Sequence, residues 1–249
     1  MKKKRILLKI GTSTLTRGTS FISRGKVEDI GRQIKALQDN YELVIVSSGA
    51  IAVAKQFVHL EGSGQEIKIK QALAAIGQPH LMRIFQDTFR ELDLLTAQCL
   101  FSAMDFENSE TRENVANTLN ALLSNGYIPV INENDTVSTE EIQFGDNDKL
   151  AALTAKLLNV DLLVMATNTN GIYNKEGETI FEVRDIDSLR SVIRPAKSDQ
   201  GTGGMSSKLI AASIAQEAGI ETWLVYGGEE DFLVKALQSQ SSFTKVNPI

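Results

Sequence analysis

Two lysines of this sequence have neighbours that suit the binding of a phosphate group. Lys9 ends an apolar run and is followed by Gly11 and Thr12, so a cation, accessible backbone N–H groups and a hydroxyl come together. Lys208 closes a glycine-rich stretch that runs into a predicted helix. The residues of this stretch are Gly201, Thr202, Gly203, Gly204, Met205, Ser206, Ser207 and Lys208. Flexible backbone donors, hydroxyls and a lysine one turn into a helix are typical of a phosphate cradle.

The spacing of these residues separates them from two common nucleotide motifs. The stretch that ends at Lys208 does not have the G-x-x-x-x-G-K-[ST] pattern of a P-loop, and no G-x-G-x-x-G follows the first predicted strand. Each segment has a plain alternative. The segment at Lys9 could be a strand end whose lysine reaches water, and the segment that ends at Lys208 could be a flexible surface loop.

Further polar segments follow predicted strands or open predicted helices. Their candidate residues are Ser48, Gly49, Asn132, Asn134, Asp135, Asp146, Asn147, Asp148, Thr167 and Asn168. Amides and carboxylates at such places can hold the α-ammonium group of an amino acid, and a carboxylate can also hold two lysines in position. The turn at Thr167 and Asn168 offers polar groups to a nucleotide. Ordinary turns and helix N-caps have the same composition and stay open as alternatives.

Composition excludes several classes of protein. The chain has 249 residues, 26 Lys and Arg against 31 Asp and Glu, and 42% hydrophobic residues, which is the balance of a globular protein without the basic surface of a nucleic-acid binder. The single cysteine, Cys99, lies in an apolar run, so we expect a core residue rather than a nucleophile. No apolar run is long enough for a signal peptide or a membrane span.

Apolar runs alternate with amphipathic segments along the chain. Strands are predicted at residues 5–10, 43–46, 94–100, 128–131, 161–166 and 222–226. Helices are predicted at residues 26–39, 67–92, 113–124, 147–158, 205–218 and 231–237, the second with a break near Gly77, Gln78 and Pro79. Residues 137–144 alternate and suggest an exposed hairpin arm.

Strands that are apolar throughout and alternate with helices indicate a mostly parallel sheet covered on both faces. We therefore predict one domain over residues 1–249, an α/β three-layer αβα sandwich. Ligands of such sheets bind beyond the carboxyl ends of the strands, where the candidate residues stand.

In these segments, taken in order, the chain resembles the amino acid kinase family, and within it the group of glutamate 5-kinases (gamma-glutamyl kinases). The resemblance covers Lys9 to about Gly228 and rests on five motifs: KIGTS at 9–13, VSSGAIA at 46–52, PVINEND at 129–135, FGDND at 144–148 and GTGGMSSK at 201–208. It implies phosphorylation of the side-chain carboxylate of L-glutamate by Mg-ATP, in the cytoplasm, as the first step of proline biosynthesis.

The resemblance also implies roles. Lys9, Asp148 and Lys208 are the catalytic set, with Asp148 orienting both lysines. ATP binding falls to Lys9, Gly11, Thr12, Thr167, Asn168, Thr202, Gly203, Gly204, Met205, Ser206, Ser207 and Lys208. Glutamate binding falls to Ser48, Gly49, Asn132, Asn134, Asp135, Asp146 and Asn147. No protein ligand is assigned to Mg²⁺, which phosphate oxygens and water would hold.

Two departures from the family pattern stand out. Asn168 stands where the family usually has Asp. The asparagine keeps an acceptor oxygen but lacks the negative charge. The sequence ends at residue 249, so we expect the C-terminal PUA domain that many members carry to be lacking. The resemblance further implies a homo-oligomer, a dimer or tetramer, with proline as a feedback inhibitor. The alternatives are a kinase of the same fold acting on acetylglutamate, aspartate, carbamate or UMP, and a non-catalytic amino-acid-binding regulator.

Overall fold

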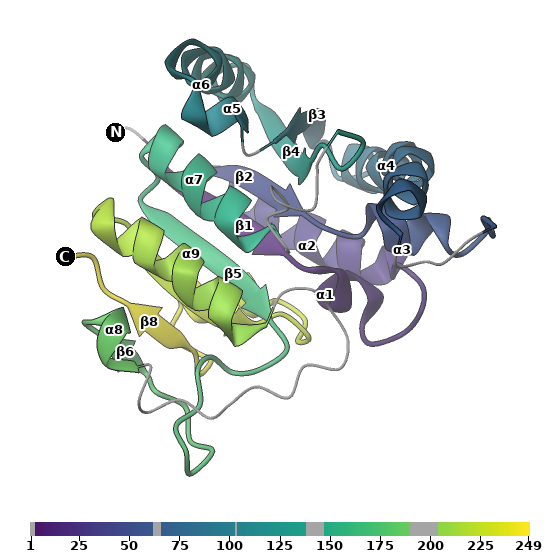
Figure 1. The fold of residues 1–249 in the computed structure, drawn as a ribbon. Coiled ribbons are helices and arrows are strands. Elements are labelled where there is room, and N and C mark those ends of the chain that lie inside the picture. The colour runs from purple at the N-terminus through teal and green to yellow at the C-terminus, as the bar shows by residue number, and fades with distance from the viewer. Residues whose placement is uncertain (1–2, 62–65, 103, 138–146, 190–203) are drawn as a thin grey trace.

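A computed structural model of the chain describes residues 3–61, 66–102, 104–137, 147–189 and 204–249. Their strands form one eight-stranded sheet in the order β3-β4-β2-β1-β5-β7-β8-β6 (Figure 1). The strands are β1 (Lys4–Ile10), β2 (Tyr41–Ser47), β3 (Leu95–Phe101), β4 (Tyr127–Glu133), β5 (Leu162–Thr167), β6 (Glu182–Val183), β7 (Glu221–Tyr226) and β8 (Thr244–Val246). The strands β3, β4, β2, β1, β5 and β7 are parallel, whereas β8 runs antiparallel to β7, so the predicted mostly parallel α/β sheet is confirmed.

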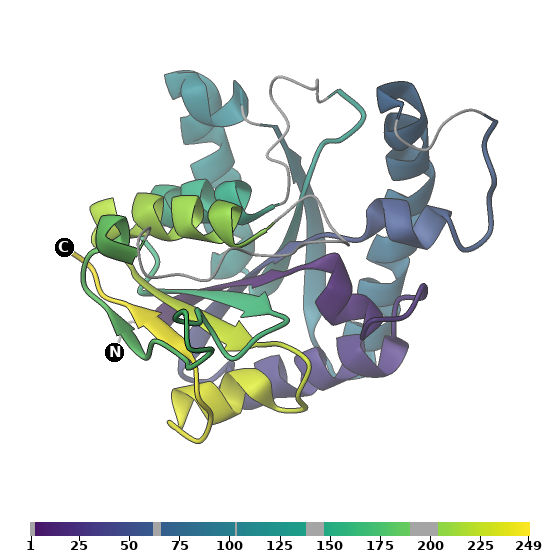
Figure 2. The same cartoon turned by 60° about the horizontal axis from the view of Figure 1, so that its bottom comes forward.

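Helices cover both faces of the sheet, which gives the three layers that the sequence predicted (Figure 2). On one face lie α5 (Met104–Glu107), α6 (Ser109–Ser124), α7 (Asp148–Leu158), α8 (Ile186–Leu189) and α9 (Met205–Glu217). On the other face lie α1 (Thr12–Thr16), α2 (Arg24–Leu37), α3 (Ala50–Ala54), α4 (Ile67–Arg90) and α10 (Phe232–Leu237).

The alternation of side chains along β1 decides which layer receives Lys9. Ile6, Leu8 and Ile10 point into the core beneath α2 and α4, whereas Leu7 points into the core beneath α7 and α9. Because side chains of a strand alternate between the two faces, Lys9 points with Leu7 toward the α7 and α9 layer.

The parallel register brings the strand ends to one edge. Ile10 pairs with Ser47 of β2 and with Ala166 of β5, so the residues after these three strands emerge side by side. The described candidate residues lie at strand ends, in the following loops and at helix starts along this carboxyl edge.

Local sequence explains where the helices begin. The Ser23 side chain accepts a hydrogen bond from the Lys26 backbone N–H at the start of α2. Asn108 does the same for the N–H groups of Glu110 and Thr111, so α6 begins at Ser109, ahead of the predicted residue 113. Among the described residues, every helix is too short or too polar to cross a bilayer.

The predicted break in the second long helix is wrong, because α4 runs from Ile67 to Arg90 with Pro79 inside it. A proline inside a helix removes one backbone hydrogen bond and costs about 3 kcal/mol. The buried face of α4, which includes Leu73, Leu81 and Phe85, offsets that cost by its packing against the core. The predicted arm at residues 137–144 lies outside the described residues apart from Val137.

Cys99 on β3 is a buried core residue, as its apolar neighbours indicated. Burial raises the pKa of its thiol to about 11, so the thiolate, which is the nucleophilic form, is scarce near neutral pH.

Candidate active site

A buried carboxylate joins the two lysines that the sequence singled out. Lys9 Nζ lies 2.5 Å from Asp148 Oδ1, and Lys208 Nζ lies 3.0 Å from Asp148 Oδ2. The Asp148 side chain is fully buried, and those of Lys9 and Lys208 are 3% and 13% exposed. The two ammonium groups therefore share Asp148 as a counter-charge.

Two ammonium groups near the carboxyl edge of a parallel sheet, where ligands of such sheets bind, can attract an anionic ligand. A phosphate group is such an anion, and lysine is a common point charge for phosphates.

Three elements hold this set in place. Lys9 comes from the end of the central strand β1, Asp148 is the first residue of α7, and Lys208 lies in the first turn of α9. The helices α7 and α9 pack side by side over the sheet (Figure 1). Ser207 Oγ lies 3.0 Å from Asp148 Oδ2 and 2.8 Å from the Gly204 carbonyl oxygen, so it ties the start of α9 to the carboxylate.

The start of α9 also presents backbone donors. Gly204 is the N-cap residue in an extended conformation, and the first turn contains Met205 and Ser206. The first N–H groups of a helix have no partner inside the helix, and the helix dipole favours an anion there. Thr202 and Gly203 lie outside the described residues.

The turn after β1 is linked to the turn after β5. Gly11 is the N-cap residue of α1, and a Cβ at this position would stand 3.7 Å from Lys9 Nζ. Thr12, which opens α1, is partly buried. Ser13 Oγ donates to Asn168 Oδ1 at 2.8 Å, so the Asn168 amide has its Nδ2 donor left to offer a nucleotide, where an Asp would offer only acceptors.

Thr167 uses its hydroxyl inside its own turn. Its Oγ1 donates to the carbonyl oxygen of Thr169 at 2.5 Å and accepts from the Thr169 N–H at 3.2 Å. The Thr167 hydroxyl therefore shapes the turn that carries Asn168.

A second group of predicted residues meets around Asn147, the residue before Asp148. Asn147 Nδ2 lies 2.6 Å from the Ser47 carbonyl oxygen, 2.7 Å from Asn132 Oδ1 and 3.1 Å from Ser48 Oγ. Gly49 stands between Ser48 and α3 with a φ of +114°, a left-handed conformation that favours glycine. The structure thus brings the ends of β2 and β4 and the start of α7 together.

Asn134 and Asp135 continue from the carboxyl end of β4. The Asn134 backbone N–H donates to the Phe101 carbonyl oxygen at 2.8 Å, which holds the segment against β3. Burial raises the pKa of the Asp135 carboxyl to about 6, because removal from water disfavours its ionised form. Asp146 lies outside the described residues.

Sequence reasoning missed Gln78. Its Oε1 accepts a hydrogen bond from Asn132 Nδ2 at 2.7 Å, so it touches the group around Asn147. A glutamine in the middle of a long helix carries no local signal of this kind. The candidate motifs of the sequence lie at strand ends and helix starts, whereas Gln78 lies inside α4.

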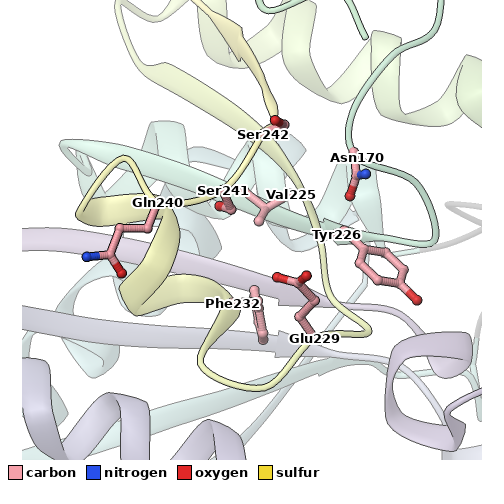
Figure 3. A pocket seen from close by; sticks show the side chains of 8 residues that line it. All are labelled: Asn170, Val225, Tyr226, Glu229, Phe232, Gln240, Ser241 and Ser242. Carbon is pink, nitrogen blue, oxygen red and sulfur yellow. The ribbon is translucent and has the colours of Figure 1, made fainter. Parts of the chain in front are cut away.

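A separate cavity of about 230 Å³ opens beyond the end of β7 (Figure 3). Val225 and Phe232 supply apolar surface, and the other lining residues, Asn170, Tyr226, Glu229, Gln240, Ser241 and Ser242, are polar. The lining contains Asn170 but neither of the two lysines nor Asp148, so the cavity neighbours the turn after β5 and is distinct from the charged set.

Comparisons with known proteins identify the family of the chain. Residues 4–226 match the Amino acid kinase family. The chain is 39% identical to the glutamate 5-kinase of Haemophilus influenzae (strain PittGG), over 98% of this chain and 69% of that protein. It is 38% identical to the glutamate 5-kinase of Clostridium perfringens (strain 13 / Type A), over 95% of this chain and 93% of that protein.

A solved structure shares the fold. The crystal structure of UMP kinase from Ureaplasma parvum superposes with a TM-score of 0.68 at 16% sequence identity, over 99% of this chain and 97% of that one. The family match over most of the chain, the two relatives at nearly 40% identity and the shared fold lead to one conclusion: this chain belongs to the amino acid kinase family.

Proposed function

We propose that this chain transfers the γ-phosphoryl group of ATP to the side-chain carboxylate of L-glutamate. The products are L-glutamyl 5-phosphate and ADP, and the reaction is the first step of proline biosynthesis. The observation that carries the proposal is the buried bridge of Lys9 and Lys208 through Asp148. The relatives that are named glutamate 5-kinase support glutamate as the acceptor.

In this reaction a carboxylate oxygen of glutamate forms a bond to the γ-phosphorus. The bond from that phosphorus to the oxygen shared with the β-phosphate breaks, and ADP leaves with the electron pair. Phosphoryl transfer needs in-line positioning and positive charge around the transferring group. Lys9 and Lys208 supply that charge, and Asp148 fixes both ammonium groups so that little reorganisation is needed.

No side chain has to remove a proton in this mechanism. The acceptor is a carboxylate, which is ionised near neutral pH and is already a nucleophile. Positioned lysines without an adjacent general base are therefore sufficient for the chemistry.

The nucleotide side of the site comprises Gly11, Thr12, Thr167, Asn168 and residues 202–208, with Lys9 at the γ-phosphate. Mg²⁺, when bound to ATP, neutralises charge on the phosphate oxygens. Both carboxylate oxygens of Asp148 face lysine ammonium groups, and the described residues contain no cluster of three or more His, Cys, Asp or Glu side chains fit for a metal. As the resemblance to the family implies, phosphate oxygens and water would hold the ion.

The amino-acid side comprises Ser48, Gly49, Asn132, Asn134, Asp135, Asp146 and Asn147. Asn147 donates its Nδ2 hydrogens to protein acceptors, so its Oδ1 is the atom that can accept from the α-ammonium group. Asp135 supplies a carboxylate for the same ammonium group.

Three further features rest on the resemblance to this family. We propose that the chain works in the cytoplasm, assembles as a dimer or tetramer, and is inhibited by proline. Proline carries the same α-carboxylate as glutamate and a secondary ammonium group. Light scattering of the purified chain, and inhibition kinetics with proline against glutamate, test the last two.

The test of the reaction is ADP release from purified chain with Mg-ATP and one acceptor at a time: glutamate, acetylglutamate, aspartate or UMP. Hydroxylamine traps an acyl phosphate as a hydroxamate. Hydroxamate formed only with glutamate is the expected result. Turnover only on another acceptor would leave the phosphate site standing and overturn glutamate as the substrate. No turnover on any acceptor, with glutamate binding retained, would favour a non-catalytic regulator.

A further inference from the structure

Gln78 belongs to a series of four hydrogen-bonded polar groups whose donor and acceptor roles are fixed by two backbone groups. The series of hydrogen bonds runs from Gln78 through Asn132 and Asn147 to the Ser47 carbonyl oxygen. Amide nitrogen donates and amide oxygen accepts, so each link of the series constrains the next.

The direction follows from two backbone groups that cannot change their roles. The Ser47 carbonyl only accepts, so Asn147 must turn its Nδ2 toward it, at 2.6 Å. The Asn132 atom 2.7 Å from the same Nδ2 must then be an acceptor, Oδ1. The Glu133 backbone N–H, which only donates, independently requires the same orientation because it donates to Asn132 Oδ1 at 2.9 Å.

With its oxygen facing Asn147, Asn132 directs its Nδ2 to Gln78. The Gln78 atom at 2.7 Å must be Oε1. The carboxamide of Gln78 therefore keeps its Nε2, a donor with two hydrogens, for another partner. The outer two of the three side chains therefore differ: Asn147 can offer its Oδ1 as an acceptor, and Gln78 can offer its Nε2 as a donor.

The backbone of α4 lies directly against the backbone of α3 next to Gln78. A Cβ on Gly77 would stand 1.8 Å from the Ala50 carbonyl oxygen, so α4 touches the backbone of α3 at the residue before Gln78. The helix α3 itself begins directly after Ser48 and Gly49. Gln78 is half-buried at this contact.

We infer that Gln78 is a specificity-determining residue whose Nε2 donates to the α-carboxylate of the amino-acid substrate. The inference rests on the proposed function. Asn147 adjoins Asp148 in the sequence and so lies nearest to the phosphoryl-transfer set, whereas Gln78 is two hydrogen bonds further along the series. The reacting carboxylate therefore belongs on the Asp148 side of Asn147, the α-ammonium group at Asn147 Oδ1, and the α-carboxylate at the Gln78 end.

Two substitutions separate donation to the substrate from support of Asn132. Gln78→Leu removes both abilities. Gln78→Glu keeps an oxygen that accepts from Asn132 Nδ2 but replaces the donor by a negatively charged acceptor, which repels a carboxylate. Gln86→Leu is the matched control, since Gln86 is an exposed glutamine on the same helix.

The measurement is steady-state ADP release, with glutamate and ATP varied in turn, together with the shift in melting temperature on adding glutamate. We expect Gln78→Leu and Gln78→Glu to raise the glutamate KM roughly tenfold to a hundredfold, with kcat and the ATP KM nearly unchanged. Both should lose the stabilisation by glutamate, and Gln86→Leu should behave as the wild type.

A Gln78→Glu variant with the wild-type glutamate KM would overturn the inference and leave Gln78 as a support of Asn132. A loss confined to kcat would place Gln78 at the reacting carboxylate and overturn it as well. If Gln78→Leu does not fold, Gln78→Glu still decides, because it retains the bond to Asn132. A wild-type chain that neither turns over nor is stabilised by glutamate would refute the proposed function and the inference together, whereas an active wild type with unaffected variants refutes the inference alone.

Discussion

Lys9 and Lys208 bind different oxygens of the same carboxylate, at 2.5 Å from Asp148 Oδ1 and 3.0 Å from Asp148 Oδ2. The spacing of the two ammonium groups is therefore set by the width of one carboxylate and by the packing of α7 against α9 and β1. This relationship makes distinct predictions for the lysines and for the aspartate.

Replacing either lysine by alanine should lower turnover far more than folding stability. Each variant keeps the other lysine beside Asp148, but the transferring phosphoryl group loses one of the two ammonium groups that we assign to it. We expect kcat to fall by at least about a hundredfold. The checks are ADP release and denaturant unfolding of Lys9→Ala and Lys208→Ala, with Lys68→Ala as the control, since the Lys68 side chain is 76% exposed. Wild-type turnover in a folded Lys9→Ala variant would remove Lys9 from the reaction.

Asp148→Asn should lower folding stability as well as turnover. The substitution removes the negative charge that both buried ammonium groups contact, and breaking a buried ion pair typically costs about 3–5 kcal/mol. Urea unfolding at low salt measures the loss. Added ATP should restore part of the stability, because its phosphates replace the missing negative charge. A variant as stable as the wild type without ligand would show that Asp148 does not hold the two charges.

Asp135→Ala should raise the glutamate KM and leave the ATP KM nearly unchanged. The substitution removes the carboxylate that we assign to the α-ammonium group, and a hydrogen bond to a charged group contributes about 1.5–3 kcal/mol. Initial rates at varied glutamate measure this change. An unchanged glutamate KM would move Asp135 out of the amino-acid site.

Asp135 should also make stability depend on pH. Its folded pKa of about 6 lies above the ordinary value of 3.8, so between those values the folded chain binds more protons than the unfolded chain. Stability therefore falls as the pH rises through this window, and the penalty is complete above about pH 6. Asp135→Asn should be more stable than the wild type at about pH 7.5, by roughly 2–3 kcal/mol at most, and the gain should vanish toward about pH 4. Urea midpoints at several pH values measure it. A gain that is constant with pH would show that the carboxyl is not perturbed.

Gly77→Ala should destabilise the fold at the contact of α3 and α4. The added Cβ would stand 1.8 Å from the Ala50 carbonyl oxygen, so backbone must move, and overpacking of this kind costs about 1–3 kcal/mol or more. Gly25→Ala on α2 is the matched control, because the nearest atom to its Cβ would be Ser23 Oγ at 3.9 Å. Thermal unfolding compares the two, and equal melting temperatures would contradict the close approach.

Much of this architecture could be predicted because buried parallel strands are apolar on both faces. The run Leu43 to Val46 and the run Leu162 to Ala166 have that pattern, and both are central strands. Polar residues at strand ends and helix starts mark the carboxyl edge, so Lys9, Asn147 and Asp148 were candidates from the sequence. Their roles come from the resemblance to the family and stay predictions.

Other features depend on contacts between distant segments, which leave no local pattern. The strand β8 has three residues, Thr244–Val246, and exists only by pairing with β7 and β6. Pro79 suggested a break because its own cost is local, whereas the packing of α4 that offsets it is not. Gln78 was missed for the same reason, because its partner Asn132 is 54 residues away.

The central position of β1 has a consequence for the order in which a newly made chain can become active. β1 precedes the other strands of the sheet in the sequence, yet its second neighbour, β5, begins only at Leu162. One edge of β1 must therefore wait unpaired until β5 is made, and an open edge of apolar residues invites aggregation. Since Lys208 is made later still, no nascent fragment that ends before this residue can assemble the phosphoryl-transfer set.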